Sequence, residues 1–349
     1  MADIRITLIP GDGIGPEVTS AAVSVIKSTD LSIDWDIQNI SAKEYSSKKV
    51  NNVLKSIKKS KVCLKGPLTT PIGHGLRSIN VFLRQSLNLY ANIRPCISIP
   101  GIESNFKNIN LTIIRENTED LYSGIELKGK NQIAALSKIV KKRISSDAAV
   151  SLKINTRDAS KKLMKFAIKY AKEKKLKHLT IVHKANILKY SDGLFLASCK
   201  SASQRSNLMI DDKLVDNMAM QLVTKPQNYQ ILVCPNLYGD ILSDLAAGIT
   251  GGLGLAPSAN IGDKCAVFEP VHGSAPKYAG KNKVNPTATI RSAVMLLHHC
   301  GYKREAQLIE NAVFRTIKAG NGTSDISPHR PLTTQKMTES IIKIVKRKR

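Results

Sequence analysis

The stretch Asp158–Lys184, DASKKLMKFAIKYAKEKKLKHLTIVHK, decides the fold class of this 349-residue chain. Its first part repeats apolar residues at i, i+3, i+4 and i+7, which predicts an amphipathic helix over 158–175, capped by Asp158 or Ser160. The apolar run Leu179–Val182 then predicts a short buried strand. A helix that leads directly into a buried strand is typical of an α/β fold.

The same alternation recurs along the chain and predicts a largely parallel sheet with ligand loops at the carboxyl ends of its strands. The other strand-like runs are Ile4–Ile9, Val62–Leu64, Leu111–Ile114 and Ile231–Val233. Asn117, Lys184 and Asn236 each follow such a run closely. Loop-rich segments at 98–108 and 248–254 predict two domain crossings. We therefore expect a large domain built from 1–99 and 252–349, and a small α/β domain from 100–251 inserted in it.

Composition limits the classes of function. The net charge of +26 admits a basic nucleic-acid-binding protein as a rival class. No aromatic residues interleave the lysines as a base-stacking surface requires, so no specific nucleic-acid partner is expected. No apolar run reaches the ~18 residues of a membrane span, so no membrane partner is expected either. The six cysteines lack C-x-x-C spacing, which predicts reduced, mostly buried thiols. The first residues resemble neither a signal peptide nor an Arg-rich presequence, which predicts a cytoplasmic protein, with a mature mitochondrial matrix form as the alternative.

The segment Gly11–Pro16, GDGIGP, follows a predicted strand and invites comparison with a dinucleotide-binding fingerprint. Its glycines fall at i, i+2 and i+4, whereas the fingerprint requires i, i+2 and i+5. We therefore predict that this turn does not belong to a Rossmann fold.

Lys184 and three carboxylates suggest a metal-assisted proton abstraction. Asp240 and Asp244 are four residues apart and share one face if their segment is helical. Such paired carboxylates, without cysteine or histidine between them, suit a hard cation such as Mg²⁺ or Mn²⁺. Asp216 is the third carboxylate considered with them. A lysine at the end of a buried strand has a pKa that desolvation can lower, and it can then accept a proton. The alternative is a solvated helix face and a surface lysine.

Arginines and short polar residues cluster between Lys65 and Arg115 and predict a site for a polycarboxylate. Arginine binds carboxylates with two parallel hydrogen bonds. For each arginine alone, the alternative is a solvated helix residue. The residues concerned are Thr70, Ser78, Asn80, Arg84, Arg94 and Arg115.

Six motifs in order resemble those of the isocitrate and isopropylmalate dehydrogenase family of metal-dependent β-decarboxylating dehydrogenases. They span essentially the whole chain. The motifs are Ile9–Glu17, Lys65–Thr70, Leu89–Pro95, His183–Asn186, Asn236–Asp240 and Glu269–Pro276. The resemblance implies this family's fold. In it, the large domain (1–99 and 252–349) would bind the coenzyme, and the inserted small domain (100–251) would carry the substrate and metal site and the dimer interface.

The resemblance implies roles for individual residues. Asp240 and Asp244 would bind Mg²⁺ or Mn²⁺, and the other subunit of a homodimer with shared active sites would supply Asp216 and Lys184. Lys184, helped by Asp240, and Tyr122 would be the catalytic proton-handling groups. The substrate-binding residues would be Thr70, Ser78, Asn80, Arg84, Arg94, Arg115, Tyr122, Lys184 and Asn186. The coenzyme-binding residues would be Thr69, Glu269, His272, Gly273, Ser274, Ala275, Lys277, Tyr278, Val284 and Asn285.

The resemblance also bears on the substrate and the coenzyme. Ser78 and Asn80, two apart, resemble the isocitrate-specific members, whereas isopropylmalate enzymes have apolar residues there. Lys277, Tyr278 and Val284 resemble the NADP pattern. Ser324 and Pro328 depart from that pattern, because NADP-using members carry tyrosine and arginine at the matching positions. These features predict an NADP-dependent, decarboxylating isocitrate dehydrogenase. An NAD enzyme, or one acting on 3-isopropylmalate or another malate-type 2-hydroxy acid, remains the alternative.

Overall fold

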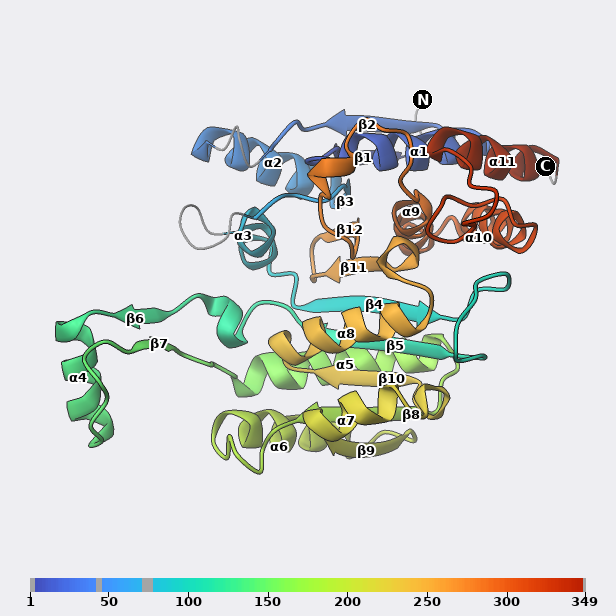
Figure 1. The fold of residues 1–349 in the computed structure, drawn as a ribbon. Coiled ribbons are helices and arrows are strands. Elements are labelled where there is room, and N and C mark those ends of the chain that lie inside the picture. The colour runs from blue at the N-terminus through green and yellow to red at the C-terminus, as the bar shows by residue number, and fades with distance from the viewer. Residues whose placement is uncertain (1–3, 42–45, 71–77, 348–349) are drawn as a thin grey trace.

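Ten strands form one continuous sheet that runs through the whole molecule (Figure 1). The computed structural model describes residues 4–41, 46–70 and 78–347. The strand order is β2-β1-β3-β12-β11-β4-β5-β10-β8-β9, and β6 and β7 form a separate two-stranded ribbon. The strands are β1 (Ile4–Ile9), β2 (Ile33–Ile37), β3 (Val62–Lys65), β4 (Ala91–Ile97), β5 (Asn110–Glu116), β6 (Glu126–Lys128), β7 (Ala149–Ser151), β8 (His178–His183), β9 (Met209–Leu214), β10 (Ile231–Cys234), β11 (Pro257–Ile261) and β12 (Ala266–Pro270).

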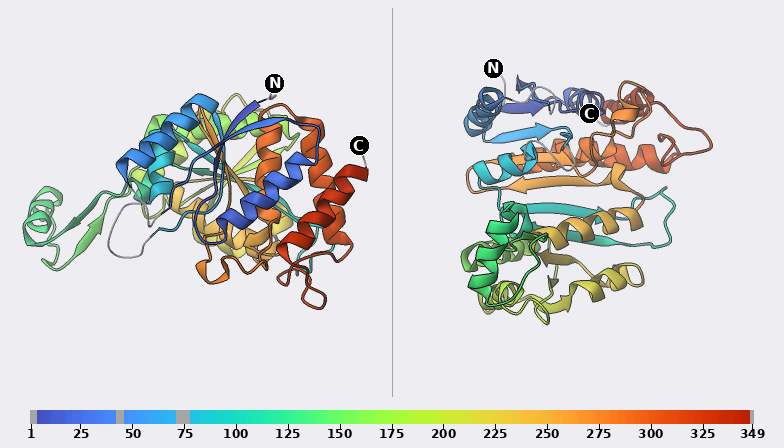
Figure 2. Two further views of the ribbon diagram at one scale, coloured as in Figure 1. Left: turned by 90° about the horizontal axis from the view of Figure 1, so that it is seen from above. Right: turned by 60° about the vertical axis from the view of Figure 1, so that its left-hand side comes forward.

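The helices cover both faces of the sheet (Figure 2). The α-helices are α1 (Gly15–Lys27), α2 (Ser47–Ser60), α3 (Ile79–Ser86), α4 (Lys130–Val140), α5 (Arg157–Glu173), α6 (Ser191–Ser203), α7 (Val215–Leu222), α8 (Asn236–Ile249), α9 (Thr287–His299), α10 (Lys303–Lys318) and α11 (Thr334–Arg347). The short 3₁₀ helices are η1 (Asp120–Ser123), η2 (Pro226–Asn228), η3 (Leu253–Leu255) and η4 (Pro276–Tyr278).

Both ends of the sheet are parallel and its centre is antiparallel. Strands β2, β1, β3 and β12 pair in parallel, as do β5, β10, β8 and β9. Between them, β11 is antiparallel to both β12 and β4, and β4 is antiparallel to β5, where Asn92 is the register partner of Arg115. The predicted α/β fold with much parallel sheet is therefore confirmed, and its topology differs from a Rossmann fold.

Alternate residues of each central strand point into two different cores. In β10, Ile231 and Val233 pack with α5 and α6 on one face, while Leu232 and Cys234 pack with α7 and α8 on the other. Because both faces are covered, strands such as β10 are continuous apolar runs rather than alternating ones. This explains why the sequence signals for these strands were short and uniformly apolar.

Two further cores lie at the other end of the sheet and draw on both chain ends. Helices α1, α9, α10 and α11 pack on one face, and α2 and α3 on the other. The N- and C-terminal segments accordingly lie side by side (Figure 1). The cores of the other half draw mainly on the middle of the chain, although β4 contributes Ala91 and Cys96 to them. The division into 1–99 with 252–349 and 100–251 stays a prediction, because the sheet itself is uninterrupted.

Several predictions about single elements can be checked against the structure. The helix predicted over 158–175 is α5, but its N-cap is Thr156, whose hydroxyl accepts the N–H of Ala159 at 3.3 Å, so the prediction of Asp158 or Ser160 was wrong. All six cysteines are free thiols and five are buried, as predicted. None of the helices in the described part of the chain combines the length and apolarity of a membrane span.

Candidate functional site

The predicted metal ligands Asp240 and Asp244 lie one turn apart on α8, so the predicted helix is confirmed. The helix begins at Asn236, directly after β10, because a buried apolar strand ends there and its loop is very short. The Asp240 side chain is 33% exposed and that of Asp244 is 55% exposed, so both remain accessible to a ligand. Because α8 follows β10 directly, both carboxylates lie near the carboxyl end of a parallel strand, which is where ligands bind in such sheets.

Two arginines from neighbouring strands converge on these carboxylates. Arg94 of β4 lies with its Nη1 3.1 Å from Asp240 Oδ1 and 3.3 Å from Asp244 Oδ1. Arg115 of β5 forms an ion pair and hydrogen bond with Asp240. Because β4 and β5 are antiparallel neighbours, their side chains on one face reach the same point above the sheet.

Arg115 is held rigidly before any ligand arrives. Its Nε donates to the main-chain oxygen and to the Oδ1 of Asn236, both at 2.9 Å, and its side chain is 1% exposed. Burial, followed by the nearby Arg94, lowers its pKa to about 9, so it stays cationic at neutral pH. Gly239 makes this packing possible, because a Cβ there would lie 2.6 Å from Arg115 Cγ.

Tyr122 completes this cluster from the turn η1. Its hydroxyl donates to Asp240 Oδ2, and the Arg115 guanidinium lies 4.8 Å from its ring centroid. Burial raises the pKa of Tyr122, although Arg115 partly opposes the shift. Burial would also raise the pKa of Asp240, but Arg115 and Arg94 outweigh it and hold that pKa below its usual value. The arrangement keeps a proton on Tyr122 and a negative charge on Asp240 at neutral pH.

Arg84 links this cluster to a buried ion network on β3 and β12. Its Nη2 donates to Glu269 Oε1 at 3.0 Å, and Lys65 Nζ lies 2.5 Å from Glu269 Oε2. Burial would raise the pKa of Glu269, but Lys65 and Arg84 together hold it well below its usual range. The Nε of Arg84 is buried without a hydrogen-bond partner among the described residues, which leaves one donor for a ligand. Glu269, predicted to bind coenzyme, thus lies beside a predicted substrate residue.

Thr70, Ser78 and Asn80 gather at the N-terminus of α3. Thr70 donates its hydroxyl to Ser78 Oγ at 3.0 Å, and Asn80 Nδ2 lies 3.4 Å from Leu68 O. Asn80 Oδ1 is buried without a partner among the described residues. A helix N-terminus with hydroxyl and amide groups favours an anion.

Lys184 and Asp216 form a second cluster, separate from the first. Lys184 follows β8 directly, as predicted, and its Nζ lies 2.6 Å from Asp216 Oδ1 at the start of α7. Lys184 lowers the pKa of Asp216 through this hydrogen bond. Asn186 lies exposed in the turn that follows Lys184. Among the described residues, no three carboxylate, histidine or cysteine side chains meet to hold a metal, so Asp216 does not join Asp240 and Asp244 within one chain.

Most of the predicted coenzyme residues, from His272 to Asn285, follow β12 in one loop that packs on the first glycine turn, whereas Glu269 lies in β12 and Thr69 follows β3. The main-chain N–H of Ile14 donates to Ser274 O at 2.9 Å, and Thr69 Oγ1 lies 2.7 Å from Ser274 Oγ. Gly13 has φ +58°, and a Cβ there would lie 2.0 Å from Ser274 O, so glycine is required at this contact. The rejected fingerprint therefore makes a tight turn that receives a second loop.

The remaining predicted coenzyme residues of this loop differ in their exposure to solvent. Gly273, Lys277 and Tyr278 are exposed, and Ala275 and Val284 are partly buried. Asn285 donates to Asp325 Oδ2 at 2.9 Å. Burial lowers the pKa of His272, whose Nε2 has no partner in the described part of the chain. An unpaired buried ring nitrogen is suited to a hydrogen bond from a ligand.

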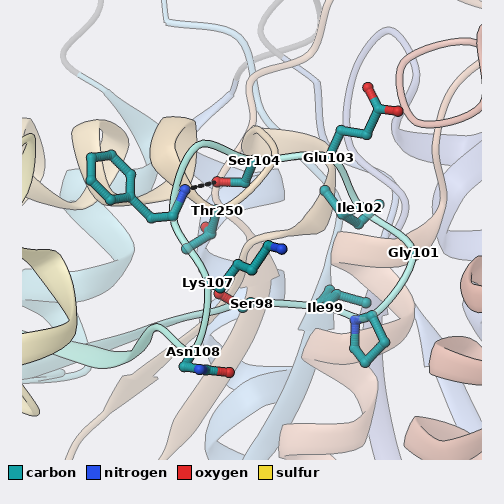
Figure 3. A pocket seen from close by; sticks show the side chains of 11 residues that line it. Ser98, Ile99, Gly101, Ile102, Glu103, Ser104, Lys107, Asn108 and Thr250 are labelled. Carbon is teal, nitrogen blue, oxygen red and sulfur yellow. Dashed lines mark hydrogen bonds between the residues drawn. The ribbon is translucent and has the colours of Figure 1, made fainter.

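Sequence reasoning missed several residues that hold the site together. Asn236 binds Arg115, Lys65 neutralises Glu269, and Asn92 Oδ1 accepts from Arg94 Nε at 2.8 Å. Asn236 was detectable because it follows a buried strand, but the partners of Lys65 and Asn92 are remote in sequence. A hollow lined by residues 98–104, 106–108 and Thr250 lies in the β4–β5 connection (Figure 3). It contains none of the predicted site residues and lies at the opposite edge of the sheet.

Comparison with known proteins gives a consistent result. A profile of the family "Isocitrate/isopropylmalate dehydrogenase" matches residues 5–341. A regulatory subunit of the mitochondrial isocitrate dehydrogenase (NAD) of Dictyostelium discoideum is 45% identical over 348 residues, covering 97% of this chain and 93% of that protein. The alpha subunit of the mitochondrial isocitrate dehydrogenase (NAD) of Homo sapiens is 42% identical, covering 98% and 90%. The crystal structure of isocitrate dehydrogenase from Methylococcus capsulatus has a TM-score of 0.90 at 45% identity and covers 98% of this chain and 99% of that one. Fold, motifs and similarity over nearly the whole length agree, and the chain belongs to the isocitrate/isopropylmalate dehydrogenase family.

Proposed function

We propose that this chain catalyses the metal-dependent oxidative decarboxylation of isocitrate to 2-oxoglutarate, with NAD as the hydride acceptor. The observation that carries the proposal is the convergence of Arg94 and Arg115 on Asp240 and Asp244. Arg84 pairs with Glu269 beside them, and its charge helps to lower the pKa of Asp240. Guanidinium groups bind carboxylates, and paired carboxylates bind a hard cation, so the cluster suits a chelated polycarboxylate.

The cation would be held by Asp240 and Asp244, with Asp216 from a second copy of the chain. The residues fit such an ion, because the available donors are carboxylate oxygens and burial, opposed by Arg94 and reinforced by Asp240, raises the pKa of Asp244. A carboxylate that burial destabilises in this way gains from a neighbouring cation. When bound, Mg²⁺ or Mn²⁺ would act as a Lewis acid that acidifies the 2-hydroxyl of the substrate and stabilises developing negative charge.

The proton transfers are assigned to Tyr122 and Lys184. Because its pKa is raised, Tyr122 is protonated at neutral pH and can donate a proton to carbon after CO₂ is lost. Lys184, helped by Asp240, would take the hydroxyl proton as hydride leaves. Lys184 and Asp216 lie together but apart from the arginine cluster, and this separation supports a homodimer in which each chain supplies Lys184 and Asp216 to the other chain's site.

The third carboxylate of isocitrate would bind near Ser78, Asn80 and Arg84. The unpaired Nε of Arg84 and the hydroxyl pair of Thr70 and Ser78 supply donors close to the N-terminus of α3. An isopropyl group there would leave these groups without partners, at roughly 1–3 kcal/mol for each buried one. Isocitrate is therefore favoured over 3-isopropylmalate.

NAD is the better-supported coenzyme, although the sequence favoured NADP. The named relatives from Dictyostelium and human are NAD enzymes. The carboxylate of Asp325 hydrogen-bonds Asn285 and Thr323, so negative charge lies beside a predicted coenzyme residue and would repel a 2′-phosphate. Lys277 is a cation that would favour a 2′-phosphate, so we expect a preference for NAD rather than a complete exclusion of NADP.

The test measures NADH and NADPH formation side by side, with Mn²⁺ and either isocitrate or 3-isopropylmalate. The proposal predicts isocitrate turnover that is faster with NAD. Faster NADPH formation would overturn the coenzyme assignment alone, and turnover of 3-isopropylmalate without isocitrate would overturn the role of Ser78 and Asn80. The basic nucleic-acid-binding alternative gains only if RNA or DNA binding survives about 200 mM salt while turnover is absent.

Location is proposed from the relatives. Those named above are mitochondrial proteins, so the expectation of a cytoplasmic protein has no support from them, and a mitochondrial matrix enzyme is the better proposal. Fractionation of the cells that make this chain, followed by immunodetection, would decide between the two.

A further inference from the structure

A largely buried lysine that sequence reasoning did not single out connects the two clusters of the site. Lys153 lies between β7 and α5, with its Nζ 2.9 Å from Asp192 Oδ1 and 3.6 Å from Asp120 Oδ1. Its Nζ also lies 3.9 Å from the ring centroid of Tyr238. Both aspartates are fully buried, and the lysine side chain is 13% exposed. A single cation therefore neutralises two buried carboxylates that come from different elements.

The first carboxylate fixes the turn that carries Lys184. Asp192, in the first turn of α6, uses Oδ1 for Lys153 and Oδ2 to accept the main-chain N–H of Lys184 at 2.7 Å. The hydrogen bond falls on the residue that follows β8, where the chain leaves the sheet. The direction in which the Lys184 side chain departs thus depends on where Asp192 is held.

The second carboxylate fixes the turn that carries Tyr122 and the start of α8. Asp120 lies two residues before Tyr122, and its Oδ2 accepts the main-chain N–H of Leu237 at 2.9 Å. Its own N–H donates to Ile154 O at 2.8 Å, beside Lys153. Asp120 has φ +66°, a conformation that persists only when its surroundings hold it. The same contacts therefore position Tyr122 and the helix of Asp240.

We propose that Lys153 is a positioning residue, which ties the Tyr122–Asp240 cluster to the Lys184 turn through Asp120 and Asp192. The test of this role by enzyme kinetics rests on the proposed function. In a homodimer with shared sites, the two tied groups would belong to two different active sites. Lys153 itself touches no predicted substrate or metal ligand, so its loss should change the rate of the chemical step more than the binding of isocitrate.

The chain offers a closely matched control in Lys162. Its Nζ lies 2.5 Å from Asp263 Oδ2 and 4.1 Å from the ring centroid of Tyr90, so it also pairs with an aspartate and lies over a tyrosine ring. It contacts neither cluster, and its side chain is 36% exposed. Lys153→Met and Lys162→Met therefore remove the same kind of interaction at two places. Only Lys153→Met removes the connection between the Tyr122–Asp240 cluster and the Lys184 turn.

The experiment compares the two variants in the full-length protein with Mn²⁺. Because a displacement of about 1 Å in an active site costs roughly 10²-fold in rate, Lys153→Met should lower kcat by about 10- to 100-fold. Its KM for isocitrate should stay within about threefold of the unaltered protein, since no substrate contact is lost. Lys162→Met should keep both values. Equal kcat in the two variants, or a raised KM with unchanged kcat in Lys153→Met, would overturn the proposal.

Amide hydrogen exchange gives a readout that does not require turnover. Lys153→Met should speed exchange at both the Lys184 and Leu237 amides, whereas Lys162→Met should change neither. If the unaltered protein does not turn over isocitrate, the proposed function fails, and hydrogen exchange alone then tests the role of Lys153. Unchanged protection of the Lys184 and Leu237 amides in Lys153→Met would overturn that role. If Lys153→Met does not fold, Lys153→Met with Asp192→Asn removes one of the two carboxylate charges left unpaired and keeps an acceptor for the Lys184 N–H. A wild-type kcat in that double variant would also overturn the proposal.

Discussion

Replacing Gly239 with alanine should impair the site although no charged residue is replaced. The added Cβ would lie 2.6 Å from Arg115 Cγ and 2.7 Å from its Cβ. Carbon atoms in contact are normally about 3.5–4.0 Å apart, so the gap must open by about 1 Å. Arg115 cannot move away freely, because it is fully buried and its Nε and Nη2 donate to Asn236. The start of α8 must therefore shift.

That shift has two measurable consequences. Overpacking of a buried contact destabilises a protein by about 1–3 kcal/mol, which urea unfolding at neutral pH will measure. A displacement of about 1 Å between Arg115 and Asp240 should lower kcat/KM for isocitrate by roughly 10²-fold. Steady-state kinetics at saturating Mn²⁺ separates this loss from weaker metal binding.

Gly248 provides the matched control on the same helix. It is exposed, and a Cβ there would meet nothing within 4 Å. Gly248→Ala should keep wild-type kcat/KM and gain up to about 1 kcal/mol from the higher helix propensity of alanine. Wild-type kcat/KM in both alanine variants would refute the conclusion that the close packing of Arg115 against α8 sets the geometry of the site.

Three further predictions concern single charges. Asp244→Asn should raise the Mn²⁺ concentration for half-maximal binding at least ~10-fold, as electron paramagnetic resonance titration of free Mn²⁺ will show, and unchanged affinity would remove Asp244 from the metal site. Glu269 has a folded-state pKa below its usual value because Lys65 and Arg84 outweigh burial, so its stabilising effect is present above about pH 4.3 and is lost as pH falls through the folded pKa. Glu269→Gln should therefore lower the free energy of unfolding at pH 7. It should also reduce the fall of the urea midpoint as the pH is lowered from about 5 to about 3, and an unchanged fall would contradict this. Lys184→Met should lower kcat by at least ~10²-fold while calorimetry shows isocitrate and metal binding retained, and undiminished activity would disprove its role in proton transfer.

The elements predicted from sequence are those with a strong local pattern. Ile4–Ile9 is predicted as a strand by its alternation of apolar residues at Ile4, Ile6 and Leu8. Leu179–Val182 is predicted by its short apolar run, which suits a strand covered on both faces. The one-turn spacing of Asp240 and Asp244 also needs nothing beyond α8 itself. The cap of α5 was misassigned because Thr156, Asp158 and Ser160 are all acceptable capping residues, and propensity alone does not rank them within one turn.

The parts that could not be predicted depend on partners remote in the chain. Glu269 reads as part of a coenzyme motif, yet its carboxylate is shared by Lys65 and Arg84, about two hundred residues earlier in the chain. Likewise, nothing in the sequence near Lys153 indicates that it lies between Asp120 and Asp192. A buried ion pair leaves no local periodicity, because its energetic requirement is a countercharge in space rather than a residue at a fixed spacing.

The charges of the first cluster are balanced only when both proposed ligands are present. Lys65 and Arg84 pair with Glu269, and Arg94 and Arg115 pair with Asp240 and Asp244, so four cations and three carboxylates leave an excess of one positive charge. A divalent cation raises that excess to three, which the three carboxylates of isocitrate would cancel. Isopropylmalate has only two carboxylates and would leave one charge unmatched in a partly buried site, where an unpaired charge is costly. Metal and tricarboxylate should therefore bind more tightly together than either binds alone, because each removes the electrostatic penalty of the other.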